Sequence, residues 1–209
     1  MNPVTVAAEL DAIAAEISEC TACELCHSRT RVVPGVGSPA TKVLLVGEGP
    51  GWHEDQQGLP FIGPSGKYLS ELLGKAGLSR EEVFITNVVK CRPPGNRDPL
   101  PDEIAACARF LDRQIAAIDP WVVITLGRFS MSRWFPGERI SKIHGTQKRI
   151  GNRVVIPMYH PAAALHQGSL RPTIEEDFAR LPKVLAEVER LRAKEAEESG
   201  PRASQSALF

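Results

Sequence analysis

Residues 42–51 read KVLLVGEGPG, a short apolar run that leads directly into a glycine-rich turn. An apolar run of this length that ends at a glycine is typical of a strand buried on both faces of a parallel sheet. Three similar runs follow, at residues 83–87, 121–126 and 153–158. Helical patterns separate these runs, so the sequence predicts an α/β fold: a three-layer α/β/α sandwich with a central four-stranded, mainly parallel sheet.

The helices of this fold are expected where apolar residues recur at intervals of three and four, or where proline and glycine delimit a segment. These segments are residues 3–18, 65–76, 101–118 and 127–135 and a long charged helix at 174–197. The glycine and proline content of residues 47–64 indicates a long loop. We expect residues 1–198 to form one domain and the polar residues 199–209 to form a flexible tail.

The composition is ordinary for a soluble globular protein: 209 residues, 43% hydrophobic, with 25 basic and 25 acidic side chains. The sequence contains no run of about 18 apolar residues, so it does not predict a membrane span. The N-terminal segment is acidic rather than basic, unlike a signal peptide. We therefore expect a cytoplasmic protein, and we expect it to be a monomer.

One segment of the chain is strongly basic. It could follow a phosphate backbone or could simply be a solvated face. Its basic residues, opposed only by Glu138, are Arg128, Arg133, Arg139, Lys142, Lys148, Arg149 and Arg153.

Polar residues follow the predicted strands at the edge where parallel sheets bind ligands. Backbone N–H groups near Gly49 could bind an anionic oxygen, although this loop matches neither a P-loop nor a dinucleotide-binding pattern. Asn87 could offer a donor and an acceptor to a planar base, Asn96 could hold a water, and His160 could stabilise a developing anion. Taken singly, each of these residues is as readily explained as a turn former, a cap or a structural histidine.

The cysteines are an odd number in a chain with no export signal, which argues against a disulfide framework. They are Cys20, Cys23, Cys26, Cys91 and Cys107. Four thiolates from separated segments suit either a [4Fe–4S] cluster or a structural zinc ion. Because Cys26 extends the first group to C-x2-C-x2-C, the spacing alone leaves open which cysteine is free.

Together these motifs resemble those of the family 4 uracil-DNA glycosylases, the iron–sulfur branch of the uracil-DNA glycosylase superfamily. The resemblance covers about residues 20–188 and rests on GEGPG with ED and GLPFIG, on ITNVVKCRPPGNR, and on HPAAAL. It implies a monofunctional DNA-repair enzyme that hydrolyses the N-glycosidic bond of deoxyuridine, releases uracil and leaves an abasic site. It also implies a [4Fe–4S] cluster held by Cys20, Cys23, Cys91 and Cys107.

The resemblance implies a role for each matching residue in binding the substrate, an everted uracil. The backbone of Glu48 and Gly49 would lie beside the uracil and the water. Phe61 would stack on the base, and Asn87 would read its O4 and N3 atoms. Glu54 would stand where the methyl group of thymine would clash.

For catalysis, the resemblance implies that His160 stabilises the departing uracil and that Asn96 positions the water. Gly49 offers no strong base, so we expect most of the acceleration to come from leaving-group stabilisation. The chain lacks the KRRIH insertion of a related branch that bonds covalently to DNA, so that mechanism is not expected. The alternative is a DNA- or nucleotide-binding module that does not cleave, but the joint presence of Phe61, Asn87, Asn96 and His160 favours an enzyme.

The chain ends in QSALF, which resembles the short peptides by which bacterial repair proteins bind the sliding clamp. Leu208 and Phe209 would fill a pocket while Gln205 sets the register. The alternative is an apolar terminus without a partner.

Overall fold

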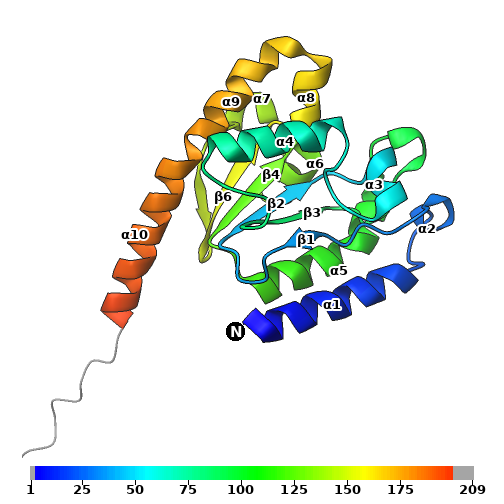
Figure 1. Cartoon of the computed structure of the whole chain (residues 1–209), viewed down its shortest axis with the longest axis horizontal. Coiled ribbons are helices and arrows are strands. Elements are labelled where there is room, and N and C mark those ends of the chain that lie inside the picture. The colour runs from blue at the N-terminus through cyan, green and yellow to red at the C-terminus, as the bar shows by residue number, and fades with distance from the viewer. Residues whose placement is uncertain (1–2, 200–209) are drawn as a thin grey trace, which may run out of the picture.

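The computed structural model describes residues 3–199, and this part of the chain contains a six-stranded sheet (Figure 1). Its strand order is β1-β3-β2-β4-β6-β5. The strands are β1 (Val36–Gly37), β2 (Val43–Gly47), β3 (Phe84–Asn87), β4 (Val122–Leu126), β5 (Lys148–Ile150) and β6 (Arg153–Met158). The strands β3, β2, β4 and β6 run parallel. They are the four strands that the sequence predicts, so the α/β class with a mainly parallel sheet is confirmed.

Helices cover both faces of the sheet, as in a three-layer sandwich (Figure 1). The helices are α1 (Pro3–Glu19), α2 (Leu25–Ser28), α3 (Trp52–Gln57), α4 (Pro64–Lys75), α5 (Pro101–Ile118), α6 (Arg128–Ser132), α7 (Ile140–Ile143), α8 (Pro161–His166), α9 (Arg171–Ala179) and α10 (Leu181–Ser199), with short 3-10 turns at Pro94–Asn96 and Gly168–Leu170. One face packs against α4, α9 and α10, and the other against α5, on which α1 lies. Because both faces are covered, every residue of β2, β3 and β4 is buried, which explains why these strands are mostly apolar.

The structure corrects three details of the sequence prediction. The sheet has two further edge strands, β1 and β5, which pair antiparallel to β3 and β6. They are too short and too exposed to produce an apolar pattern. The expected loop at 47–64 contains the helix α3. The single helix expected at 174–197 is two helices, because Pro182 has no N–H to donate to the carbonyl of Phe178.

The basic segment between Arg128 and Arg153 is divided between the two edges of the sheet. Arg128 follows the carboxyl end of β4, whereas Arg153 begins β6 at the amino edge. Both are paired with carboxylates, Arg128 with Asp98 and Arg153 with Asp119. The segment therefore does not form one continuous track for phosphates.

Between residues 3 and 199, none of the helices combines the length and the apolar character that crossing a bilayer requires. The flexible tail predicted for 199–209 and the peptide with Gln205, Leu208 and Phe209 lie outside the described residues, apart from Ser199 at the end of α10.

Candidate functional site

A pocket of about 450 Å³ lies at the carboxyl edge of the parallel strands. This volume is in the range of small-molecule sites. The pocket brings together all seven residues that the sequence nominates for substrate binding and catalysis. They are Glu48, Gly49, Glu54, Phe61, Asn87, Asn96 and His160.

Asn87 is the last residue of β3 and is 1% exposed. Its side-chain oxygen Oδ1 has no hydrogen-bond partner. A buried acceptor without a partner costs free energy, so this oxygen, on a residue that lines the pocket, suits a ligand that donates a hydrogen bond. Its backbone carbonyl accepts a 2.8 Å bond from the buried ammonium group of Lys90, which also donates to Thr86 and Gln114.

The ring of Phe61 forms an apolar wall of the pocket and is stacked on the imidazole of His160, with ring centroids 5.4 Å apart. Two glycines make room for Phe61. A Cβ at Gly47 would lie 2.6 Å from the Phe61 ring and 2.4 Å from Asn87 Oδ1, and a Cβ at Gly66 would lie 1.8 Å from the Phe61 carbonyl oxygen. A side chain at Gly47 would therefore displace the ring, and one at Gly66 would displace the Phe61 backbone.

Glu54 projects from the first turn of α3 and is 7% exposed. Its Oε1 accepts hydrogen bonds from the backbone N–H groups of Ile62 and Gly63, at 2.9 and 2.8 Å. The carboxylate therefore orients the loop that carries Phe61, in addition to lining the pocket. The exclusion of thymine by Glu54 stays a prediction.

His160 follows β6 and caps the N-terminus of α8: its Nδ1 accepts a 3.1 Å bond from the backbone N–H of Ala162. In the neutral ring, the proton is then on Nε2. Burial lowers the pKa of His160 to about 4, although the Glu54 carboxylate opposes this shift. At pH 7 the side chain is therefore a neutral hydrogen-bond donor.

Glu48 is the first residue after β2, and its side chain lies at the pocket. Burial raises its pKa to about 7; the Asp98 carboxylate raises it further, and Arg128 opposes the shift. The Glu48 carbonyl accepts a 3.2 Å bond from the N–H of Val89. A Cβ at Gly49 would lie 2.8 Å from the Val89 side chain, so the backbone here approaches its neighbour closely.

Asn96 is exposed on the loop between β3 and α5, with a left-handed φ of 55°. Its Oδ1 accepts a 2.7 Å bond from Arg92 Nε. The loop is held in turn by Arg97, which donates two bonds to the buried carboxylate of Glu103, at 2.6 and 2.9 Å. Asn96 thus reaches the pocket from a stiffened loop, with its side chain oriented by Arg92.

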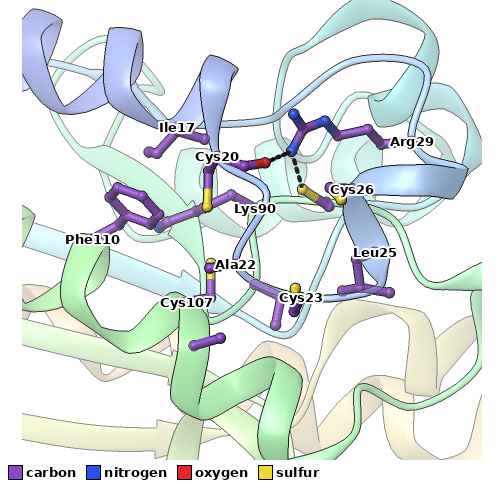
Figure 2. Close-up of a pocket in the computed structure, with 13 residues that line it drawn as sticks. Ile17, Cys20, Ala22, Cys23, Leu25, Cys26, Arg29, Lys90, Cys107 and Phe110 are labelled. Atoms are coloured by element: carbon purple, nitrogen blue, oxygen red, sulfur yellow. Dashed lines mark hydrogen bonds between the residues drawn. The ribbon is translucent and has the colours of Figure 1, made fainter.

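A second pocket lies between the end of α1, the residues after β3, and α5, and all five cysteines line it. Figure 2 shows the side chains of Cys20, Cys23 and Cys107 pointing toward the same space. Arg29 donates to the Cys91 sulfur at 3.3 Å and to the Cys20 carbonyl at 2.8 Å. The buried Lys90 also lines this pocket.

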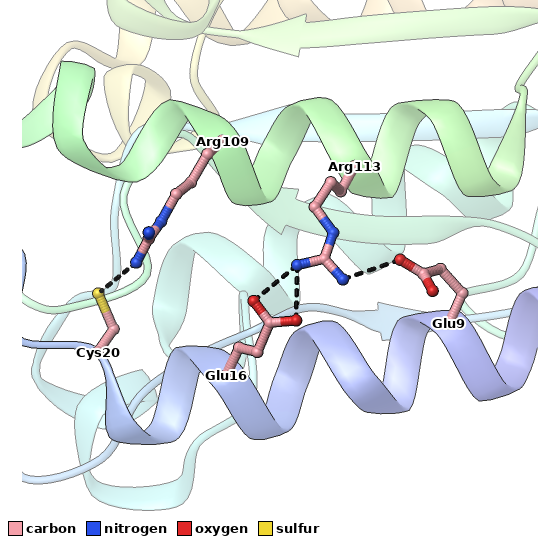
Figure 3. A network of polar contacts seen from close by, with 5 residues as sticks. All are labelled: Glu9, Glu16, Cys20, Arg109 and Arg113. Carbon is pink, nitrogen blue, oxygen red and sulfur yellow. Dashed lines mark hydrogen bonds and ion pairs between the residues drawn. The ribbon is translucent and has the colours of Figure 1, made fainter.

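The N-terminal segment that carries Cys20 is fixed to α5 by ionic contacts (Figure 3). Arg113 on α5 pairs with Glu9 and Glu16 on α1, at 2.9 and 2.7 Å. Arg109, one turn earlier on α5, donates to the Cys20 sulfur at 3.6 Å. These contacts bring the first cysteine group to the helix that carries Cys107.

The chemistry of this second pocket fits an anionic, sulfur-ligated group. Thiols from three separate segments converge there, two guanidinium groups donate to their sulfurs, and Lys90 also lines the pocket. These cations would balance the negative charge of the thiolates that such a group requires. Within the described residues, no three Cys, His, Asp or Glu side chains are arranged as ligands of a single metal ion.

Several residues that support these sites are not among those that the sequence nominates, and Lys90, Arg92 and Arg80 are examples. Lys90 and Arg92 lie inside the ITNVVKCRPPGNR motif, but the motif does not reveal which groups they contact. Arg80, which donates to the carbonyls of Pro60 and Phe61, lies in the connection between α4 and β3. No local pattern distinguishes it from a surface arginine.

The fold and the pocket together define a class of protein. An unpaired amide oxygen beside a buried aromatic ring suits a planar heterocycle that carries an N–H group, as a nucleic-acid base does. The chain is thus an α/β protein with a pocket at the carboxyl edge of its sheet whose lining suits a planar heterocycle.

Comparison with known proteins narrows this class. Residues 34–185 match the family model described as the uracil DNA glycosylase superfamily. A type-4 uracil-DNA glycosylase of Saccharolobus solfataricus is 46% identical over 187 residues, which cover 85% of this chain and 87% of the relative. Those of Sulfurisphaera tokodaii and Thermotoga maritima are 46% and 43% identical and each cover 82% of this chain, with 83% and 92% of the relatives covered. The chain belongs to the uracil-DNA glycosylase superfamily, in its type-4 branch.

Proposed function

We propose that this protein removes uracil from DNA by hydrolysing the N-glycosidic bond of deoxyuridine, leaving an abasic site. The observation that carries the proposal is the buried, unpartnered Oδ1 of Asn87, in a pocket that also contains Phe61 and His160. Uracil presents an N–H at N3 to such an acceptor, whereas cytosine presents a lone pair there.

Binding requires the nucleotide to leave the base stack, at a cost of roughly a few kcal/mol. Stacking on Phe61 offsets part of this cost. Asn87 accepts from N3–H and donates to O4 of uracil. Cytosine would place a donor and an acceptor at the wrong positions, and the buried amide would then lose its hydrogen bonds.

Breaking the glycosidic bond leaves negative charge on uracil and positive charge on the sugar. Nε2–H of the neutral His160 donates to the uracil anion, and the backbone N–H groups after β2 add to this stabilisation. Asn96, oriented by Arg92, positions the water that attacks the sugar. The imidazole is already neutral at pH 7, so it donates this hydrogen bond without any prior change in its protonation state.

The activity is tested by incubating the protein with an oligonucleotide that contains one uracil, followed by alkali. We expect strand scission at the uracil and none in the same oligonucleotide with thymine. Absence of scission, from protein with its full complement of iron, would leave a binding module that does not cleave. Single- and double-stranded substrates give the strand preference.

A [4Fe–4S] cluster, held by Cys20, Cys23, Cys91 and Cys107, belongs to the proposal. The cluster would supply a structural cross-link between α1, the loop after β3 and α5, three segments that are distant in the sequence. Arg29 and Arg109, which already donate to the sulfurs of Cys91 and Cys20, would donate to ligands of the bound cluster.

Replacing Cys107 with serine is expected to remove the visible absorbance and most of the iron, which should be about four atoms per chain in the wild type. The melting temperature should fall by about 10 °C, because the three segments lose their cross-link. Cys26→Ser is the matched control, since it removes a thiol from the same pocket but should leave the iron content unchanged. The opposite pattern, with iron lost only from the Cys26 variant, would show that the ligand set is wrong.

Glu48 provides a prediction on stability. Its pKa is about 7 in the folded protein against an ordinary value of 4.5. The folded state therefore holds a proton that the unfolded state releases, and stability falls as the pH rises from about 4.5 to 7. Glu48→Gln removes this penalty, so its melting temperature relative to wild type should rise between pH 5 and pH 8. A difference that stays constant over this range would contradict the prediction.

Two further proposals concern partners. The C-terminal peptide with Gln205, Leu208 and Phe209 is proposed to bind the sliding clamp. A binding titration that compares the full chain with a chain lacking residues 205–209 tests this proposal.

Residues 1–198 are proposed to act as one monomeric domain in the cytoplasm, where a repair enzyme meets the chromosome. Light scattering of the purified protein gives the oligomeric state.

A further inference from the structure

The backbone of Phe61 is strained. Its φ of 53° lies in the left-handed region, which is unfavourable for a residue with a side chain because Cβ comes too close to the following carbonyl oxygen. Without constraints, the residue would return to negative φ, and its side chain would point elsewhere. The position of the ring in the pocket therefore depends on whatever holds this backbone conformation.

Two side chains of opposite charge hold the loop. The guanidinium of Arg80 donates from Nη2 to the carbonyl of Pro60 at 2.8 Å and from Nη1 to the carbonyl of Phe61 at 3.0 Å. On the following residues, Glu54 accepts from the N–H groups of Ile62 and Gly63. Arginine fixes the carbonyls on either side of the Phe61 Cα atom, and glutamate fixes the two amides that follow it.

The planar guanidinium group of Arg80 matches the spacing of its two carbonyl acceptors. Two successive carbonyls are bound by two nitrogens of one planar group, an arrangement that a lysine, with a single nitrogen, cannot reproduce. Arg80 comes from the connection between α4 and β3 and is partly buried. It is absent from the residues that line the pocket, so it acts on the pocket through the loop.

We propose that Arg80 is a positioning residue for uracil excision, which holds Phe61 in the left-handed conformation that places its ring against the base. The inference rests on the proposed function, because it requires that Phe61 stack on the substrate. In Arg80→Met the two carbonyls lose their donors while the length of the side chain is largely kept. The strained backbone then relaxes, and the ring leaves its place beside His160.

The test is a double-mutant cycle in the cluster-containing protein, with single-turnover rates on uracil-containing DNA. Arg80→Met is expected to lower the rate about 10- to 100-fold, since displacements of about 1 Å have effects of this size. In a Phe61→Ala background, the same change should lower the rate less than about threefold. Arg80→Lys should recover part of the loss. Arg153→Met, which removes an arginine at the opposite edge of the sheet, should leave the rate unchanged.

A second measurement separates positioning from contact with DNA. Affinity for DNA with an abasic site, which offers no base for Phe61, should be the same in Arg80→Met and wild type. Equal losses with and without Phe61, or weaker binding to abasic DNA, would overturn the inference and leave the proposed function intact. If Phe61→Ala alone had no effect, the stacking role would fail instead. If Arg80→Met does not fold, the cycle is measured with Arg80→Lys instead. If Arg80→Lys then lowers the rate by the same factor in the wild-type and Phe61→Ala backgrounds, the inference is overturned.

Discussion

Replacing His160 with alanine is expected to slow the chemical step about 10²- to 10³-fold, the usual effect of removing one donor to a developing anion. The single-turnover rate at saturating enzyme reports this step. Affinity for uracil-containing DNA should change little, because the donor acts mainly on charge that appears as the bond breaks. His160 is neutral in the folded protein, with a pKa of about 4, so the loss should be constant from pH 6 to pH 9.

The control for this experiment is His27→Ala, a change at an exposed histidine on α2, which should leave the rate unchanged. An unaltered rate in His160→Ala would refute the leaving-group role. A rate that is unaltered while DNA binding weakens would instead make His160 a contact to the substrate in its ground state.

Replacing Asn87 with aspartate is expected to change the base that the protein excises. The amide accepts from N3–H and donates to O4, as uracil requires. An aspartic acid in its protonated form can donate to N3 and accept from the amino group of cytosine. We expect excision of uracil to fall at least 10²-fold, with cytosine excision rising above its background, because buried polar groups penalise a mismatched partner strongly.

Asn87→Ala separates recognition from simple loss of contact. This variant should lose uracil excision without gaining any activity on cytosine, since it offers neither a donor nor an acceptor. The measurement is the rate of strand scission for oligonucleotides that differ only at the target base. If the aspartate and alanine variants had the same base preference, Asn87 would not be the group that reads the base.

The local sequence carries much of the information for this fold. Strands β2, β3, β4 and β6 are buried on both faces, and such strands produce apolar runs that can be recognised without any knowledge of their neighbours. In a parallel sheet, the ends of these strands meet at one edge. The residues after β2, β3 and β6 could therefore be assigned to one site, and the pocket does contain all seven nominated residues.

Other features depend on contacts between distant segments, and no local pattern encodes them. The edge strands β1 and β5 exist because longer strands offer them hydrogen bonds. The left-handed backbone of Phe61 is maintained by Arg80 and Glu54, which lie 19 residues after it and seven before it.

The chain's own residue types and order thus determined a parallel α/β sheet, a ligand edge and the chemical groups available there. The tertiary structure decided the state of those groups: an amide oxygen without a partner, an imidazole kept neutral and a carboxyl group that titrates near pH 7. The physical reason is that hydrogen-bond partners and loss of solvent are properties of a place in the folded molecule. Two histidines or two asparagines in one sequence acquire different chemistry from the segments that pack around them.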